Sequence, residues 1–283
     1  MKRILSILGL FIALSTAARE LPVHCAIDTA KVNQLIAELK TADRPTGERM
    51  VAAARAFAGA EEDDYYFTDS IGALRINVDS FSPLMFINNV VALAKTSENP
   101  GLNDWRTFAR EFEDISCRRG EFTGYPSIMY HTSDWIGDNM ARGNLRELTE
   151  DYPSMVVVRT KSLDEMTRKR GNFAALADST TFETVRMVEM GFRTHRVPSL
   201  KKETIKKKEL VSDLQDGDII ILVPNRDGID VYDIGVITMK EGLPYFIHVS
   251  PTAHKVVEEE EDLARYMSLM TKYFQGYRIL RLK

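Results

Sequence analysis

The residues of this chain that could do chemistry centre on one helix start. A short extended run leads through Ser82 and Pro83 into a long apolar segment. A serine hydroxyl can accept a free backbone N–H of the first helical turn, and proline suits the first helical position because no N–H is needed there. Several hydrolase classes place a nucleophile at such a position, because the helix dipole lowers the pKa of a thiol and free N–H groups hold an oxyanion. In this chain, Pro83 occupies the position where those hydrolases have their nucleophile. The sequence therefore indicates either a site without its nucleophile or a capped core helix.

The cysteines and histidines give weaker signals. Cys25 and Cys117 could form a disulfide in an oxidising compartment, and two free thiols fit the sequence equally well. Cys117 lies in the polar segment ISCRRG, which is typical of a turn and supplies no base for a reactive thiol. His131 and Asp134 precede or open a predicted helix, where a capping role is commoner than metal binding. We expect neither a metal nor a cofactor.

The N-terminus is typical of a secretory signal peptide. Lys2 and Arg3 precede an apolar run over residues 4–14, and small residues follow at 15–18. This run is too short for a comfortable membrane span. We therefore predict a signal peptide at residues 1–18, export to the periplasm or another extracytoplasmic space, and no membrane span after cleavage.

The composition is that of an ordinary globular protein, with 44% apolar and 28% charged residues among 283. The formal net charge of -4 gives no excess of positive charge for binding a nucleic acid, so we expect no such partner. The basic run over residues 201–208 is interrupted by an acidic residue and predicts a solvated surface segment.

Helical patterns fill the first half of the chain and strand patterns the last third. Apolar periodicity predicts helices at about 28–39, 47–58, 83–94 and 105–115, one from Thr132 or Ser133 onward, and one at about 259–274. Runs of β-branched and aromatic residues predict strands at 155–160, 218–223, 233–238, 244–249 and 278–282. This order predicts an α+β fold with N-terminal helices packed on a mostly antiparallel C-terminal sheet. No disordered linker divides residues 19–283, so we predict a single domain.

Three segments resemble one known family. Residues 76–94, INVDSFSPLMFINNVVALA, align without a gap with a pattern like VNLEGFDCTTFVENVLALA. Residues 125–139, YPSIMYHTSDWIGDN, are similar to YASRLHYTSDWIDN, and GDII, DIGV and HVS at 217–220, 233–236 and 248–250 are similar to GDII, HVGI and HAS. These are patterns of the bacterial N-acetylmuramoyl-L-alanine amidase-like branch of the papain-like, NlpC-type cysteine peptidases. The resemblance covers most of the chain after residue 18 and implies a papain-like NlpC-type fold.

The differences from the family fall at its catalytic positions. The family's nucleophilic cysteine, basic histidine and orienting histidine correspond here to Pro83, Asp233 and His248. Proline supplies neither a nucleophile nor a backbone N–H for an oxyanion. A family arginine, for which the resemblance implies a role in substrate binding, is replaced by Ile128, and a family histidine is replaced by Tyr130. The resemblance therefore implies a degenerate member that lacks the catalytic cysteine and histidine.

We predict an exported, catalytically inactive amidase-like protein that binds a muropeptide, another peptidoglycan fragment or a protein partner. The candidate cleft residues are Ser80, Ser82, Asn88, Tyr130, His131, Asp134, Trp135, Asp233 and His248. One alternative is an active N-acetylmuramoyl-L-alanine amidase or peptidase in which Cys117 or a serine acts as nucleophile and His131 or His248 as base. Another is a scaffold whose old cleft is filled by aromatic side chains. An open, polar cleft would favour ligand binding, and a closed cleft would favour the scaffold.

Overall fold

The computed structural model describes residues 29–40, 43–63, 73–98 and 104–283. The predicted signal peptide and Cys25 lie outside the described residues. Within these residues, no helix combines the length and apolar character needed to cross a membrane. The same residues contain no group of histidine, cysteine and acidic side chains that could hold a metal ion.

The described part of the chain contains both α-helices and short 3-10 helices. The α-helices are α1 (Thr29–Lys40), α2 (Thr46–Ala56), α3 (Pro83–Glu98), α4 (Trp105–Ser116), α5 (Thr132–Arg142), α6 (Glu165–Arg168), α7 (Ser179–Met190), α8 (Lys208–Val211) and α9 (Leu263–Leu269). The 3-10 helices are η2 (Arg118–Gly120), η3 (Tyr125–Ser127), η4 (Thr149–Asp151), η5 (Arg170–Asn172), η6 (Ala174–Ala177) and η7 (Lys202–Lys206).

One mostly antiparallel sheet runs through the described part of the chain. Its strands are β1 (Glu61–Glu62), β2 (Ser80–Phe81), β3 (Leu145–Glu147), β4 (Val156–Lys161), β5 (His195–Lys201), β6 (Ile219–Pro224), β7 (Asp233–Lys240), β8 (Leu243–Ser250), β9 (Lys255–Glu258) and β10 (Phe274–Leu282). The order is β2-β1-β9-β8-β7-β6-β10-β5-β4, with β3 also paired to β10. Among these described strands, only β1 and β2 pair in parallel. The predicted mixed α+β class is confirmed.

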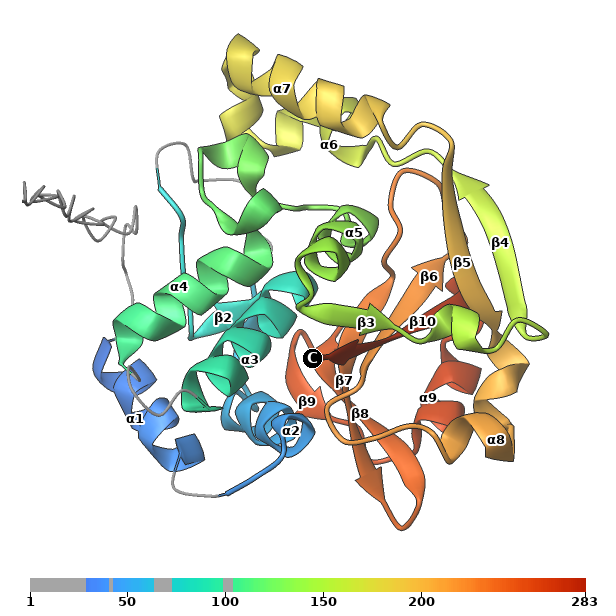
Figure 1. The fold of residues 1–283 in the computed structure, drawn as a ribbon. Coiled ribbons are helices and arrows are strands. Elements are labelled where there is room, and N and C mark those ends of the chain that lie inside the picture. Colours follow the sequence, from blue (N-terminus) through green and yellow to red (C-terminus); the bar gives the residue numbers. More distant parts are fainter. Residues whose placement is uncertain (1–28, 41–42, 64–72, 99–103) are drawn as a thin grey trace, which may run out of the picture.

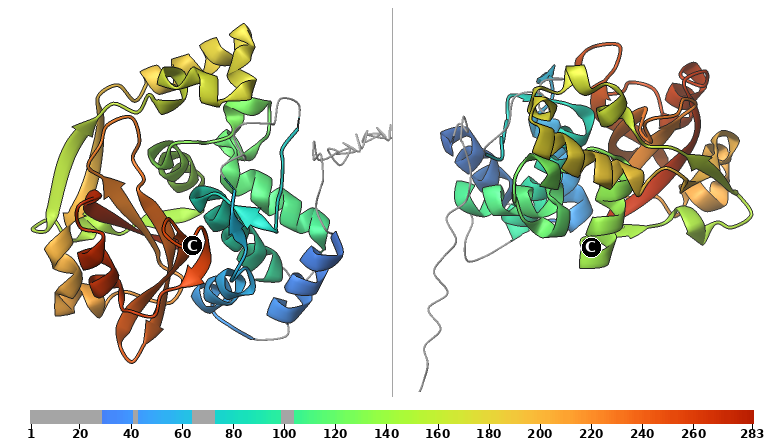
Figure 2. Two further views of the ribbon diagram at one scale, coloured as in Figure 1. Left: turned by 180° about the vertical axis from the view of Figure 1, so that it is seen from behind. Right: turned by 90° about the horizontal axis from the view of Figure 1, so that it is seen from above.

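Helices cover the central strands on both faces. The helices α1 to α4 lie on one side of these strands and α8 and α9 on the other (Figures 1 and 2). Because side chains alternate along a strand, Ile234 and Val236 of β7 pack in the core formed with α3, whereas Ile237 packs in the core formed with α9. A side chain on β7 or β8 therefore reaches either the α3 side or the α9 side of the sheet.

The central helix predicted at residues 83–94 is confirmed as α3, which begins at Pro83 and is almost wholly buried. The capping role predicted for Ser82 is wrong. The Ser82 hydroxyl is buried without a hydrogen-bond partner, and only the Ser82 carbonyl enters the first turn, where it accepts from the Phe86 N–H at 2.9 Å. The hydroxyl is therefore a buried polar group whose hydrogen bond is missing, which is an uncommon state in native proteins.

Other predicted elements differ in length or burial. Helix α1 buries the predicted stripe of Val32, Leu35, Ile36 and Leu39. The helix predicted at 259–274 is only α9, because Asp262 caps its start by accepting the Arg265 N–H and residues 270–273 turn into β10. The strand predicted as buried at 155–160 is β4, which is largely exposed because it is the edge strand of the sheet.

Candidate functional site

A cavity of about 490 Å³ opens beside the start of α3. Its walls come from segments that are far apart in the sequence: β1, the start of α3, the start of α5, α6 with η5, and the loop between β6 and β7. The lining residues are Glu62, Ser82, Pro83, Leu84, Tyr130, His131, Glu165, Asn172, Phe173, Arg226, Ile229, Asp230, Val231 and Tyr232. The cleft is therefore open and carries both polar and aromatic side chains, which is typical of ligand sites.

Asp230 joins the β6–β7 loop to the start of α5. Its carboxylate accepts the backbone N–H of Thr132 at 3.1 Å and that of Ser133 at a shorter distance. Burial alone would raise the pKa of Asp230, but the nearby His131 and these hydrogen bonds lower it. The predicted capping role of His131 is wrong, because its side chain makes no capping bond and a residue almost a hundred positions away caps α5 instead.

His131 is held from α7 by Glu189. The two side chains are 4% and 3% exposed, and His131 Nε2 lies 2.8 Å from Glu189 Oε1. Glu189 also accepts the backbone N–H groups of Met166 and Thr167, at 3.0 and 2.9 Å, and the Thr167 hydroxyl at 2.5 Å. Burial would raise the pKa of Glu189, but the hydrogen bonds from His131 and Thr167 lower it. This leaves His131 Nδ1 buried without a hydrogen-bond partner.

Tyr130 forms another part of the cavity wall. Its hydroxyl donates to Glu165 Oε2 at 3.0 Å, and burial together with the Glu165 charge raises its pKa. Glu165 also pairs with Lys169 at 2.7 Å and lies 3.7 Å from Arg226. The Tyr130 ring meets Phe173 edge to face, with 5.5 Å between centroids. Tyr130 therefore narrows the cavity without filling it.

Asp233 and His248, which the motif resemblance predicts to correspond to the family's base and orienting residue, lie close together on the α9 side of the sheet. His248 Nδ1 is 2.8 Å from Asp233 Oδ2, and its Nε2 is 2.9 Å from Glu259 Oε1. Tyr266 of α9 donates to Asp233 Oδ2 at 2.5 Å. Gly235 lies opposite His248, where a Cβ would approach the His248 Cβ to 2.7 Å. Among the described residues, the lining of the 490 Å³ cavity includes neither Asp233 nor His248.

The paired carboxylates control the charge of His248. Burial alone would lower the pKa of this imidazole, but the charge and hydrogen bonds of Asp233 and Glu259 raise it to about 9. Burial and the Asp233 charge also raise the pKa of the Tyr266 phenol. His248 is therefore a charged group in an ion-pair cluster rather than a neutral base beside the start of α3.

The remaining predicted cleft residues lie outside the lining of the 490 Å³ cavity. The Ser80 hydroxyl donates to Asp63 at 3.1 Å and accepts from Asn77 at 2.7 Å. The other three lie outside the lining of the 490 Å³ cavity: Asn88 is buried in α3, Asp134 pairs with Arg118, and Trp135 is buried in α5. The structure therefore brings Ser82, Pro83, Tyr130 and His131 to the cavity and places Ser80, Asn88, Asp134 and Trp135 elsewhere.

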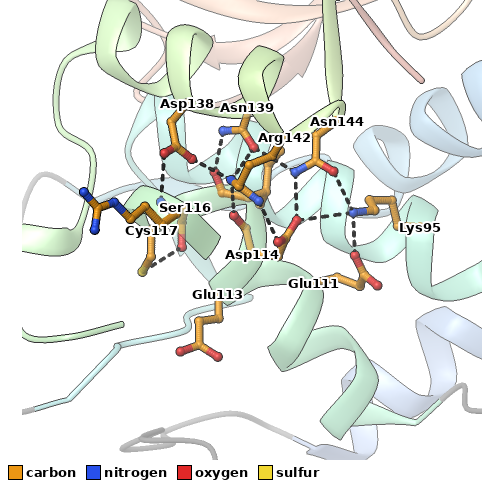
Figure 3. A network of polar contacts seen from close by, with 12 residues as sticks. Lys95, Glu111, Glu113, Asp114, Ser116, Cys117, Asp138, Asn139, Arg142 and Asn144 are labelled. Carbon is orange, nitrogen blue, oxygen red and sulfur yellow. Dashed lines mark hydrogen bonds and ion pairs between the residues drawn. The ribbon is translucent and has the colours of Figure 1, made fainter. Parts of the chain in front are cut away.

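Cys117 is buried at the end of α4 rather than exposed in the predicted polar turn. It is a free thiol whose contact with the Ser116 hydroxyl is 3.7 Å long, and burial raises its pKa to about 12. Figure 3 shows it beside a network in which Arg142 binds Asp114 and Asp138. Neither Cys117 nor Ser82 has a histidine within hydrogen-bond reach, so neither has the base that a nucleophile requires.

The described site therefore contains a cavity with charged and aromatic walls but lacks a paired nucleophile and base. The sequence did not predict the residues from distant segments that form or support the cavity, namely Glu165, Glu189, Arg226 and Asp230. It also did not predict the partners of His248, namely Glu259 and Tyr266. Asp230, Glu165 and Glu189 carried no local signal, because they contact residues 98, 35 and 58 positions away.

The comparisons with known proteins agree with the family resemblance. A family model described as AmiA-like, N-acetylmuramoyl-L-alanine amidase-like, matches residues 66–272. No curated protein matches the chain closely enough to count as a relative. Several solved structures share the fold. One is an N-acetylmuramoyl-L-alanine amidase from Bacteroides uniformis, with a TM-score of 0.72, 24% identity, and coverage of 84% of this chain and 99% of that one.

Two further structures are similar. A putative xylanase from Bacteroides fragilis has a TM-score of 0.72 and 24% identity, with 82% of this chain and 100% of that chain covered. A protein from Legionella pneumophila has a TM-score of 0.69 and 15% identity, with 90% and 94% covered. At these identities the likeness shows a shared fold.

Proposed function

The chain belongs to the AmiA-like family of N-acetylmuramoyl-L-alanine amidase-like proteins, and from this we propose that it is an exported, catalytically inactive member with a papain-like NlpC-type fold. In this proposal it binds a muropeptide or another peptidoglycan fragment in the cavity beside the start of α3. One observation carries the proposal: Pro83 stands at the position of the family nucleophile, yet the cavity next to it is open and lined by charged, polar and apolar side chains. If the protein served only as a structural scaffold, we would expect side chains to fill this cavity.

The position of the family's base supports the loss of catalysis. The equivalent residue, Asp233, is bound to His248 and Tyr266 on the α9 side of the sheet. Acyl transfer needs a nucleophile, a base within hydrogen-bond reach and an oxyanion site. Pro83 removes the first of these and one backbone donor of the third.

The alternative of an active enzyme with a different nucleophile is less well supported. Cys117 is buried with a raised pKa, so its reactive thiolate form is strongly disfavoured. Binding of a protein partner at the same cavity is a second candidate, but a concave cavity of about 490 Å³ fits a small peptide or sugar better than a flat protein surface.

Titration calorimetry with a purified muropeptide, paired with an assay for released peptide, tests the proposal. We expect binding without release of peptide. The variant Asn172→Trp places an indole at the cavity rim and should weaken binding, whereas Thr184→Trp on the exposed side of α7 should not. Peptide release that is lost in Ser82→Ala or His248→Ala would show an active enzyme and overturn the proposal, as would the absence of any binding.

Export is proposed on the sequence of residues 1–18 alone. Mass spectrometry of the protein recovered from the extracytoplasmic fraction should find an N-terminus that begins after Ala17 or Ala18. Recovery of the uncleaved chain from the cytoplasm alone would contradict it.

A further inference from the structure

We propose that the outer edge of β4 binds an extended acidic peptide, which adds to the sheet as one more strand. This edge is separate from the cavity beside α3, so the inference does not rest on the proposed function. It comes from the direction of the backbone groups in β4 and from the charges beside this strand.

Strand β4 has an unpaired edge. It is the last strand in the order of the sheet, and among the described strands it pairs only with β5. Figure 1 shows it at the end of the molecule opposite to α1. The free edge of such a strand presents a row of N–H and C=O groups, to which another extended chain can bind.

The register of β4 and β5 shows which backbone groups point outward. The Lys201 N–H donates to the Met155 carbonyl at 3.1 Å, so this pair is one of those that exchange hydrogen bonds. Such pairs alternate along an antiparallel ladder with pairs that do not bond to each other. The residues of β4 that turn their backbone groups away from β5 are therefore Val156, Val158 and Thr160. Pro198 lies opposite Val158 and lacks an N–H, which agrees with this assignment.

The outward backbone groups are open to a partner. Val158 is 41% exposed, and Arg159 and Thr160 are also exposed. Within the described residues, no hydrogen bond joins Val158 or Thr160 to a segment other than β5. The edge can therefore accept a further strand without breaking an existing contact.

Positive charge surrounds this edge. A hollow of about 430 Å³ lies beside β4 and β5, and its charged lining residues are Arg159, Lys201, Lys202 and Glu203. Neither Arg159 nor Lys201 forms an ion pair within the described part of the chain. Lys202 donates to the Thr271 carbonyl at 2.9 Å and keeps its charge. Three cations against one carboxylate favour an acidic ligand.

The two faces of β4 differ in charge. Because side chains alternate along a strand, Arg159 lies on the face of the hollow, and Thr160 lies on the other face opposite Arg196 of β5. A peptide with acidic residues at alternate positions can therefore place all of them beside the hollow, where cross-strand pairs of opposite charge stabilise the added strand. The same cations disfavour a basic strand, so the edge is selective.

A second copy of this chain fits the edge less well. If two β4 strands paired about Val158, their Arg159 side chains would lie on one face as diagonal neighbours, about 7 Å apart. Lys201 and Lys202 of both copies would add to the positive charge on that face. This repulsion favours an acidic peptide over a second copy.

Fluorescence anisotropy with labelled peptides tests the inference. The probes are the acidic peptide EVEVEV, its analogue QVQVQV, and two forms of EVEVEV that are N-methylated either on the glutamate amides or on the valine amides. We expect QVQVQV to bind about fivefold more weakly, because the cross-strand charge pairs are lost. Amides of alternate residues point to opposite edges of a strand, so only one methylated form should keep its binding.

Each comparison between the peptides has a result that contradicts the inference. Equal binding of EVEVEV and QVQVQV would overturn the acidic preference. Equal affinity of the two methylated forms would overturn the addition of a strand, because a purely electrostatic contact does not distinguish the two edges of the peptide.

Two variants locate the binding at β4. Val158→Pro removes an outward N–H without removing a bond to β5, so EVEVEV should no longer bind. Arg159→Glu should weaken EVEVEV and strengthen the basic peptide KVKVKV. Arg110→Glu, at an exposed position of α4, is the charge-matched control and should change neither affinity.

Urea unfolding shows whether Val158→Pro folds, and Arg159→Glu carries the test if it does not. Wild-type affinity for EVEVEV in Arg159→Glu would refute the assignment to this edge. Sedimentation velocity of the wild type should show a monomer. A dimer that is lost in Val158→Pro would show that a second copy occupies the edge and would overturn the inference.

Discussion

The charged His248 cluster should make the stability of the protein fall in alkaline solution. The pKa of His248 is raised from 6.5 to about 9 in the folded protein. A group with a raised pKa stabilises the fold fully below its unfolded pKa, and this contribution is lost as the pH rises through the folded pKa. The stabilising contribution of His248 is therefore fully present below pH 6.5 and is lost as the pH rises from 6.5 to about 9.

The change in unfolding free energy follows from the shift in the pKa of His248. One pKa unit corresponds to about 1.4 kcal/mol, so the shift of His248 corresponds to about 3 kcal/mol of unfolding free energy. The His248 side chain is fully buried, so solvent screening takes little from this value. Such a loss is a large fraction of the stability of a typical domain.

Urea unfolding of the wild type and of His248→Gln, measured from pH 6 to pH 10, checks this prediction. Other groups titrate in both proteins and cancel in the difference between them. We expect the advantage of the wild type to shrink by about 3 kcal/mol across the range. Thr184→Gln, an exposed substitution on α7 that removes no titratable group, is the control, and its difference from wild type should stay nearly constant. A difference for His248→Gln that does not change with pH would refute the reasoning.

Three further predictions concern other buried groups. Cys117 should react with iodoacetamide only after unfolding, because burial raises its pKa to about 12, and labelling of its peptide in the folded protein would contradict this. Asp230→Ala should lower the unfolding free energy by about 2 kcal/mol, because it removes the buried cap of α5. Asp178→Ala, which removes a surface cap of α7, should cost clearly less in the same urea experiment. Tyr266→Phe should cost about 1 kcal/mol through the lost bond to Asp233, whereas Tyr273→Phe, at a half-exposed ring, should be nearly neutral in thermal unfolding.

The local features of the fold could be predicted from the sequence. The apolar stripe of α1 and the continuous apolar character of α3 follow from periodicity within one helix. Pro83 at the start of α3 follows from the steric preference of proline. The alternating strands of the last third also follow from local composition, although their lengths changed wherever pairing extended or shortened them.

The site could be predicted only in part, because its contacts join distant segments. Asp230 meets Thr132 across 98 positions, and Glu189 meets His131 across 58. No local pattern signals such a contact, so Asp230 and Glu189 were missed. The sequence also did not predict which side of the sheet Asp233 faces, because this depends on which helix packs against each face. The capping prediction for Ser82 failed for a related reason, since its hydroxyl is turned into the protein interior.

The position of β10 bears on how the protein can reach its native state. This strand is the last in chain order, yet it lies inside the sheet and pairs with β3, β5 and β6. The strands β4 and β5 join the rest of the sheet through it. A ribosome-bound chain that still lacks residues 274–282 therefore cannot complete the sheet. Because β4 and β5 reach the other strands only through β10, their docking is a late step of folding that requires residues 274–282.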